Sequence, residues 1–83
     1  MSASRQTIRE WLEKGKSMGA THVVIALDTY DYDNYPVYVK PGGKSAQEEA
    51  DRVNAGSMQS VDEVYDLSMD IDEQMSLPRV WNT

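Results

Sequence analysis

The chain has no cysteine and no phenylalanine, and its single histidine is His22. Without cysteine it can form neither a disulfide framework nor a thiolate-bound zinc site. No apolar stretch approaches the roughly 20 residues that a membrane-spanning helix needs, and no signal-peptide pattern opens the chain. We therefore expect a cytoplasmic protein that does not contact a membrane.

The sequence patterns of common catalytic and binding sites are also missing. The segment Gly42–Ser45, GGKS, matches the end of a phosphate-binding loop, but the first glycine of that motif would fall on Tyr38. No metal-ligand or nucleophile pattern accompanies His22, so we interpret this histidine as structural. We expect no enzyme activity, no cofactor and no metal site.

The formal net charge of the 83 residues is −6, and it is unevenly distributed. Residues 1–20 carry four basic and two acidic residues, whereas residues 21–83 carry four basic and twelve acidic ones. A surface this acidic repels the phosphates of nucleic acids and anionic lipids. The charge therefore disfavours direct nucleic-acid binding and favours a protein partner with a basic surface.

Residues 21–40 are predicted to form a β-hairpin. The apolar run from Val23 to Leu27 is typical of a strand, and its residues are apolar on both faces, which indicates a central strand. The second strand is predicted from Pro36 to Lys40. Proline has no N–H to donate to a neighbouring strand, so Pro36 must be the first residue of this strand or lie on a strand at the edge of the sheet.

The predicted loop between these strands, residues 29–35, has the sequence TYDYDNY. Turn formation explains its aspartates and its asparagine, but not three tyrosines. The tyrosines either fold back over the edge of the sheet or form a contact surface, since tyrosine offers a large rigid area and a hydroxyl that tolerates water. On the second interpretation the partner-binding residues are Tyr30, Asp31, Tyr32, Asp33 and Tyr35.

Two capping boxes predict the starts of two helices. The first box, Thr7–Glu10, leaves residues 1–6 frayed and opens a helix whose apolar stripe is Ile8, Trp11, Leu12, Gly15 and Met18. We expect Trp11 to be the largest contact of this helix with the sheet. The second box, Ser45–Glu48, opens a helix that runs to about Ala55.

Two periods compete in the acidic C-terminal segment, residues 61–75. Val61, Tyr65 and Leu67 alternate with polar residues as in a half-buried strand, whereas Val61, Val64, Ser68, Ile71 and Met75 would form a helical stripe. We favour a strand to about Leu67, followed by a short helix that Asp70 caps and that ends before Pro78.

The carboxylates of this segment have two interpretations. They either form a solvated face or present a row of negative charge to a basic groove. The strand would place Asp62 and Asp66 on one face. On the second interpretation the additional partner-binding residues are Asp62, Asp66, Asp70 and Asp72.

Together these elements predict a single α+β domain over residues 1–83 in the order α-β-β-α-β-α. The simplest arrangement has two layers, a small antiparallel sheet of about three strands with the helices mainly on one face. Such a sheet leaves one edge and one face partly uncovered. Pairing of two copies would bury both, so a homodimer is a further expectation.

The stretch from Thr7 to Gly43 resembles a family of short, functionally uncharacterised bacterial and bacteriophage proteins. The resemblance lies in the helix start TIREWL, the step GATH, the hairpin segments DTYDYD and YPVYV, and the later segment VYDLSMD. It covers most of the chain and brings no catalytic motif. It implies a bacterial or viral genomic setting, and a bacteriophage-encoded protein would act in the cytoplasm of its host.

These observations favour a small acidic protein that acts by covering a partner's surface. With the resemblance, the most specific form of this hypothesis is a bacteriophage inhibitor of a host defence or nucleic-acid-handling complex, in the manner of an anti-CRISPR or a nucleic-acid mimic. An alternative is a small-ligand-binding or sequestering protein, with tyrosines and His22 lining a site at a homodimer seam. A third hypothesis is a minor structural or assembly protein.

Overall fold

The computed structural model describes residues 3–83. The elements follow in the order α1 (Arg5–Ser17), β1 (His22–Asp28), β2 (Asp33–Val39), α2 (Ala46–Ala55), β3 (Gln59–Asp66) and α3 (Ile71–Met75). This order, with an antiparallel sheet of three strands, confirms the predicted α+β fold. In the part of the chain described, no helix is long and apolar enough to cross a membrane.

The sheet has the order β2-β1-β3, so the apolar run of the first hairpin strand is central, as predicted. β1 pairs antiparallel with both neighbours. Pro36 lies on β2, which is an edge strand, opposite Ile25. The proline therefore occupies the kind of position that its missing N–H allows.

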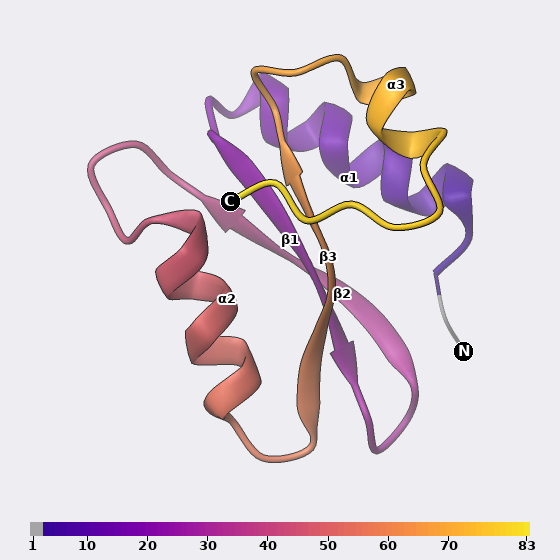
Figure 1. The fold of residues 1–83 in the computed structure, drawn as a ribbon, viewed down its shortest axis with the longest axis vertical. Coiled ribbons are helices and arrows are strands. Elements are labelled where there is room, and N and C mark those ends of the chain that lie inside the picture. The colour runs from indigo at the N-terminus through magenta and orange to yellow at the C-terminus, as the bar shows by residue number, and fades with distance from the viewer. Residues whose placement is uncertain (1–2) are drawn as a thin grey trace.

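Helices cover both faces of the sheet, which differs from the predicted placement mainly on one face. α1 and α3 lie on one side, and α2 lies on the other (Figure 1). Val23 and Ile25 belong to the core beneath α1, whereas Val24 and Ala26 belong to the core beneath α2. Because both faces of β1 are apolar, each has to be covered, and the fold has three layers instead of two.

The first helix begins one turn earlier than predicted. Ser4 is the N-cap and its side chain accepts a hydrogen bond from the Thr7 backbone N–H. Serine caps a helix as well as threonine does, and the earlier start adds a turn of hydrogen bonds. Residues 5 and 6 are therefore helical, Ser4 is the cap, and Ala3 N–H donates to the Asn34 side chain at 2.8 Å. The prediction that residues 1–6 are frayed was wrong for residues 3–6, and residues 1 and 2 lie outside the described residues.

The apolar side of α1 is the predicted stripe without Met18, which follows the helix and is exposed, and with a different centre. Leu12 is fully buried, whereas Trp11 is only partly buried and packs beside the core. Gly15 is also buried, and a Cβ atom built on it would lie 2.9 Å from the side chains of Leu67 and Val23. This glycine therefore allows the helix to approach the sheet closely.

A β-bulge in β3 explains why two periods competed there. Ile25 pairs with Glu63 and Ala26 pairs with Val61, so Asp62 is an extra residue in β3. The bulge reverses the faces of the residues that follow it. Val61 therefore packs beneath α2, and not with Tyr65 beneath α1 as the simple alternation predicted.

The C-terminal residues return to the outer edge of β3 (Figure 1). Val64 N–H donates to the Val80 carbonyl at 3.0 Å, and Asn82 N–H donates to the Val64 carbonyl at 2.9 Å. These two bonds form a short parallel bridge between Val64 and Trp81. We call residues 79–83 the tail.

Candidate functional site

Two loops meet at the end of the sheet where β1 stops. Asp28, the last residue of β1, pairs with Asp33 on one side and with Gln59 on the other. The loop 29–32 connects β1 to β2, and Met58 immediately precedes β3. Thr29 N–H donates to the Met58 carbonyl at 2.9 Å, so the two loops are joined by their backbones.

The loop 29–32 is shaped by local contacts. The Asp28 carboxylate accepts a hydrogen bond from Tyr30 N–H at 2.8 Å. This bond forms an Asx-turn, in which an aspartate side chain binds the backbone two residues later. Tyr32 has φ of 58°, and Met58, in the neighbouring loop, has φ of 57°. Large side chains rarely adopt this left-handed conformation, which costs roughly 1–2 kcal/mol per residue.

Three large side chains are exposed on these loops. Tyr30 is 73% exposed, Tyr32 is 64% exposed and Met58 is 56% exposed. We call these three residues the tyrosine end. Asp31 and Asp33 are also exposed at this end. The sequence indicated the tyrosines by composition, whereas no periodic signal marked Met58.

Tyr35 differs from the two loop tyrosines. It lies within β2, packs against the core beneath α2, and its hydroxyl donates to the Gln59 side chain at 3.3 Å. The two interpretations of the tyrosines therefore each describe part of the hairpin: Tyr35 lies against the sheet, whereas Tyr30 and Tyr32 are displayed.

The structure does not assemble the four C-terminal aspartates into one row. Asp62 accepts a hydrogen bond from Asn34, on the face that carries α1. Asp66 follows the bulge and, by alternation with Tyr65, lies on the opposite face. The prediction that Asp62 and Asp66 share a face was wrong, because a sequence pattern does not reveal the extra residue of a bulge.

The other two aspartates serve the short helix. Asp70 is the N-cap of α3 and accepts a hydrogen bond from Glu73 N–H at 2.9 Å. Asp72 forms an ion pair with Arg9 of α1. Both carboxylates thus have structural roles in attaching or starting α3, although both residues remain exposed.

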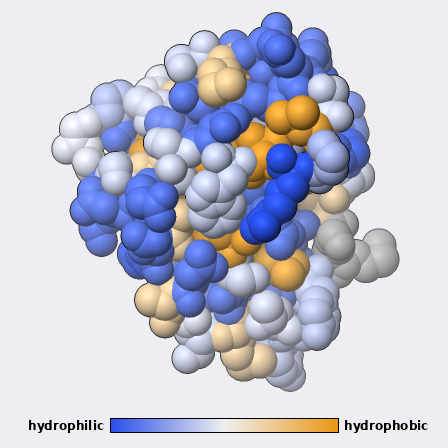
Figure 2. All heavy atoms as spheres, in the orientation of Figure 1, coloured by the Kyte–Doolittle hydropathy of each residue, from blue (hydrophilic) through white to orange (hydrophobic). Residues whose placement is uncertain are grey.

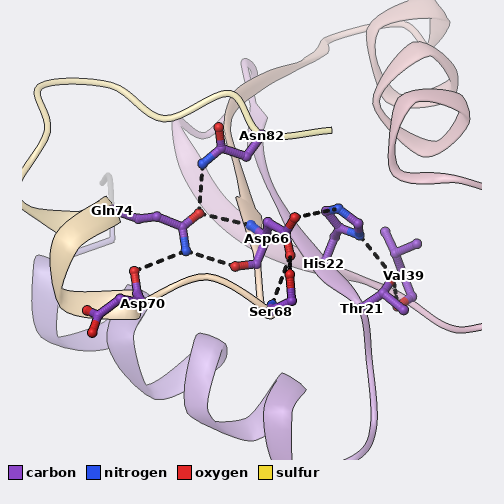
Figure 3. A network of polar contacts seen from close by, with 8 residues as sticks. All are labelled: Thr21, His22, Val39, Asp66, Ser68, Asp70, Gln74 and Asn82. Carbon is purple, nitrogen blue, oxygen red and sulfur yellow. Dashed lines mark hydrogen bonds and ion pairs between the residues drawn. The ribbon is translucent and has the colours of Figure 1, made fainter.

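Asp66 is the centre of a polar network at the other end of β1 (Figure 3). Its carboxylate accepts hydrogen bonds from the Ser68 N–H at 2.8 Å and hydroxyl at 2.7 Å, and it lies 3.7 Å from His22 Nε2. The Ser68 hydroxyl, joined by the Ser68 N–H and by His22, lowers the pKa of Asp66. Sequence reasoning did not detect this pairing.

His22 is positioned by the hydroxyl of Thr21. Thr21 Oγ1 lies 2.9 Å from His22 Nδ1 and donates to the Val39 carbonyl at 3.3 Å. A hydroxyl has one proton, so when it donates to the carbonyl, His22 Nδ1 must be the donor to Thr21. His22 is therefore held by Thr21 through Nδ1, and its Nε2 faces the Asp66 carboxylate.

The ligand-binding hypothesis required tyrosines and His22 in one site. His22 begins β1, whereas the tyrosine end follows its last residue, which at the usual rise of a strand is a separation of about 20 Å. A single chain therefore does not bring these side chains together.

Two buried polar side chains were not identified from the sequence. Glu63 is only 8% exposed, and Gln74 is also buried. The Gln74 amide accepts a hydrogen bond from Asp66 N–H at 3.0 Å and donates to the Asp66 carbonyl at 2.8 Å. The strand alternation does place Glu63 on the apolar face with Tyr65 and Leu67, whereas nothing in the sequence marks Gln74 as buried.

Comparison of the chain with protein-family models, with curated proteins and with solved structures finds no match. Within residues 3–83, no three histidine, aspartate or glutamate side chains gather in a way that could hold a metal ion. The candidate site is therefore chosen from the exposed side chains. Among the residues described, Tyr30, Tyr32 and Met58 of the tyrosine end are the three most exposed large hydrophobic residues.

Proposed function

We propose that the protein is an interaction module that binds a partner protein through the tyrosine end and acts by covering part of that partner's surface. The observation that carries this proposal is the joint exposure of Tyr30, Tyr32 and Met58 on two loops whose backbones are hydrogen-bonded to each other. Exposed aromatic and methionine side chains are enriched in the centres of protein interfaces.

The construction of the two loops supports a binding role. The Asp28 carboxylate and the bond between Thr29 and Met58 hold the loops in place before any partner arrives. Less conformational entropy is then lost on binding, which raises affinity. The left-handed backbone at Tyr32 and Met58 lowers the stability of the folded chain. Such conformations are concentrated at functional sites in proteins.

The charge of the chain indicates the chemistry of the partner. The net charge is −6, and Asp28, Asp31 and Asp33 lie in and beside the loop of the tyrosine end. A basic partner surface would be attracted over several ångströms, which accelerates association and makes the rate sensitive to salt. Nucleic acid would be repelled by the same charges.

The resemblance to short bacterial and bacteriophage proteins supports a narrower proposal about this partner. Proteins that handle nucleic acid present basic surfaces, and an acidic module that covers such a surface prevents that protein from binding nucleic acid. The narrower proposal is therefore an inhibitor of a host defence or nucleic-acid-handling complex, of the anti-CRISPR or nucleic-acid-mimic type.

The test compares retention of bacterial proteins by immobilised wild type and by the double variant Tyr30→Ser/Tyr32→Gly. We expect a protein retained by the wild type to be lost from the variant. Glycine at position 32 suits the positive φ, so the backbone of the loop should be preserved. Circular dichroism and urea unfolding would establish that both chains are equally folded.

Met18→Ser provides a matched control, because Met18 is an exposed large side chain at the end of α1, beside the opposite end of the sheet. This variant should retain the same protein as the wild type. The rate at which that protein associates with the wild type should fall as the salt concentration rises from about 50 to 500 mM. Equal retention by all three chains would exclude the tyrosine end as the contact surface.

A further inference from the structure

The tail is bound to β3 as a separate strand would be. Two backbone hydrogen bonds join it to Val64, at 3.0 and 2.9 Å. Val80 N–H donates to the Glu63 carboxylate at 3.1 Å, and Arg79 Nε donates to the Asp62 carbonyl at 3.0 Å. Addition of an extended segment to a sheet edge is a common mode of peptide recognition.

Side chains continue this edge on both sides of the backbone bridge. Beyond the bridge, the Gln74 amide bonds to both the N–H and the carbonyl of Asp66, as a peptide group of a neighbouring strand would (Figure 3). The Asn82 side chain donates to the same Gln74 oxygen at 2.9 Å. The outer edge of β3 from Asp62 to Asp66 therefore offers backbone groups and side-chain partners to an extended segment, and we call this edge the groove.

The tail is held in this groove by few buried contacts. Val80 is its single fully buried side chain and belongs to the core beneath α1. Trp81 is exposed, with the Arg79 guanidinium 5.4 Å from its ring centre. Hydrophobic atoms lie open between hydrophilic ones where the tail crosses β3 (Figure 2).

We propose that the outer edge of β3 is a binding groove for an extended segment of a partner protein, and that the tail occupies this groove as a competing ligand of the same chain. The tail defines what the groove accepts: a strand parallel to β3, with an aliphatic residue at the position of Val80 and a side-chain amide at that of Asn82. This surface is separate from the tyrosine end and does not depend on it.

The surroundings of the groove indicate the charge of the segment. Arg79 is the one basic residue after Arg52. Its Nε donates to the carbonyl of Asp62, which precedes Glu63 in β3. An open hollow of about 390 Å³ adjoins Asn82, and Asp70 and Glu73 are among the residues that line it. A partner segment with basic residues on both sides of the aliphatic anchor would therefore be favoured over an acidic one.

The experiment uses a fluorescent peptide with the sequence of residues 78–83, PRVWNT, and the full-length chain. The variant Val80→Ser weakens the tail in its own groove and leaves the groove intact. We expect it to bind the peptide at least about tenfold more tightly than the wild type, because affinity rises with the fraction of chains whose groove is open. The peptide should also raise the thermal midpoint of the variant.

A second variant, Arg79→Ala/Asn82→Ala, retains Val80 and removes two polar contacts of the tail, which covers the case in which Val80→Ser does not fold. It should also bind the peptide more tightly than the wild type. Met18→Ser is the control and should bind it as the wild type does. A peptide with aspartate in place of its valine should bind none of them.

Two results would overturn the proposal. One is peptide affinity that is equal for the wild type and for whichever tail variants are folded. The other is equal binding of the valine and aspartate peptides, since the groove would then recognise no anchor.

Discussion

Removal of the Glu63 carboxylate is the most direct test of how β3 is held. Glu63 lies on the face of β3 toward α1, and its carboxylate accepts hydrogen bonds from the Tyr65 hydroxyl at 2.8 Å and from Val80 N–H at 3.1 Å. Arg5 Nη1 lies 3.5 Å from it. The variant Glu63→Ala leaves the first two donors buried without an acceptor.

The magnitude follows from those two donors. A buried donor left without a partner costs about 1–3 kcal/mol, and both Tyr65 and Val80 are almost completely buried. The contact with the half-exposed Arg5 adds about 0–1 kcal/mol. We therefore expect Glu63→Ala to lower the free energy of unfolding by about 2–7 kcal/mol. Glu63→Gln keeps one oxygen acceptor and should lose about half as much.

Urea unfolding followed by circular dichroism measures these changes, with the midpoint reporting stability if the slope is unchanged. A chain of this length has a total stability of only about 4–12 kcal/mol, so the glutamine variant ensures a measurable transition. Glu13→Ala, the same change at an exposed position of α1, should stay within about 0.5 kcal/mol of the wild type. A loss below about 1 kcal/mol for Glu63→Ala would refute the burial of these donors.

Two further predictions concern the packing of the sheet face that carries α1. Gly15→Ala should lower the free energy of unfolding, measured in urea, by about 1–2 kcal/mol. The added Cβ would lie 2.9 Å from the side chains of Leu67 and Val23, and this clash outweighs the gain in helix propensity. Gly43→Ala is the control, because its Cβ would meet only the Lys40 carbonyl at 3.5 Å, and equal stability of the two variants would contradict the close approach of α1. Burial and the hydrogen bond to Glu63 raise the pKa of Tyr65 from 10.0 to about 12. The stabilisation of the folded state by the Tyr65 hydroxyl is therefore complete below pH 10 and is lost as the pH rises through 12. The stability difference between wild type and Tyr65→Phe should therefore narrow from pH 10 upward, and a difference that stays constant to pH 12 would count against that shift.

Elements whose signals are local could be predicted from the sequence. The capping box of Ser45 and Glu48 and the helix to Ala55 appear in the structure as predicted, because each signal acts within three or four residues. The apolar run of β1 likewise indicated a central strand before any partner strand was known. The exposed Tyr30 and Tyr32 were indicated by composition alone.

Features that depend on distant parts of the chain were decided only by the tertiary structure. The bulge at Asp62 reversed the faces of β3, and it is a property of the register between β3 and β1. Two of the three partners of the Glu63 carboxylate, Arg5 and Val80, lie 58 and 17 residues away in the sequence.

The side of the sheet that α2 covers and the docking of the tail have the same character. A sequence pattern states which residues prefer burial, and it does not state which strands and helices meet. By itself the sequence therefore determined the elements and their order. The three layers, the buried carboxylate and the occupied edge of β3 arose only when segments far apart in the chain packed together.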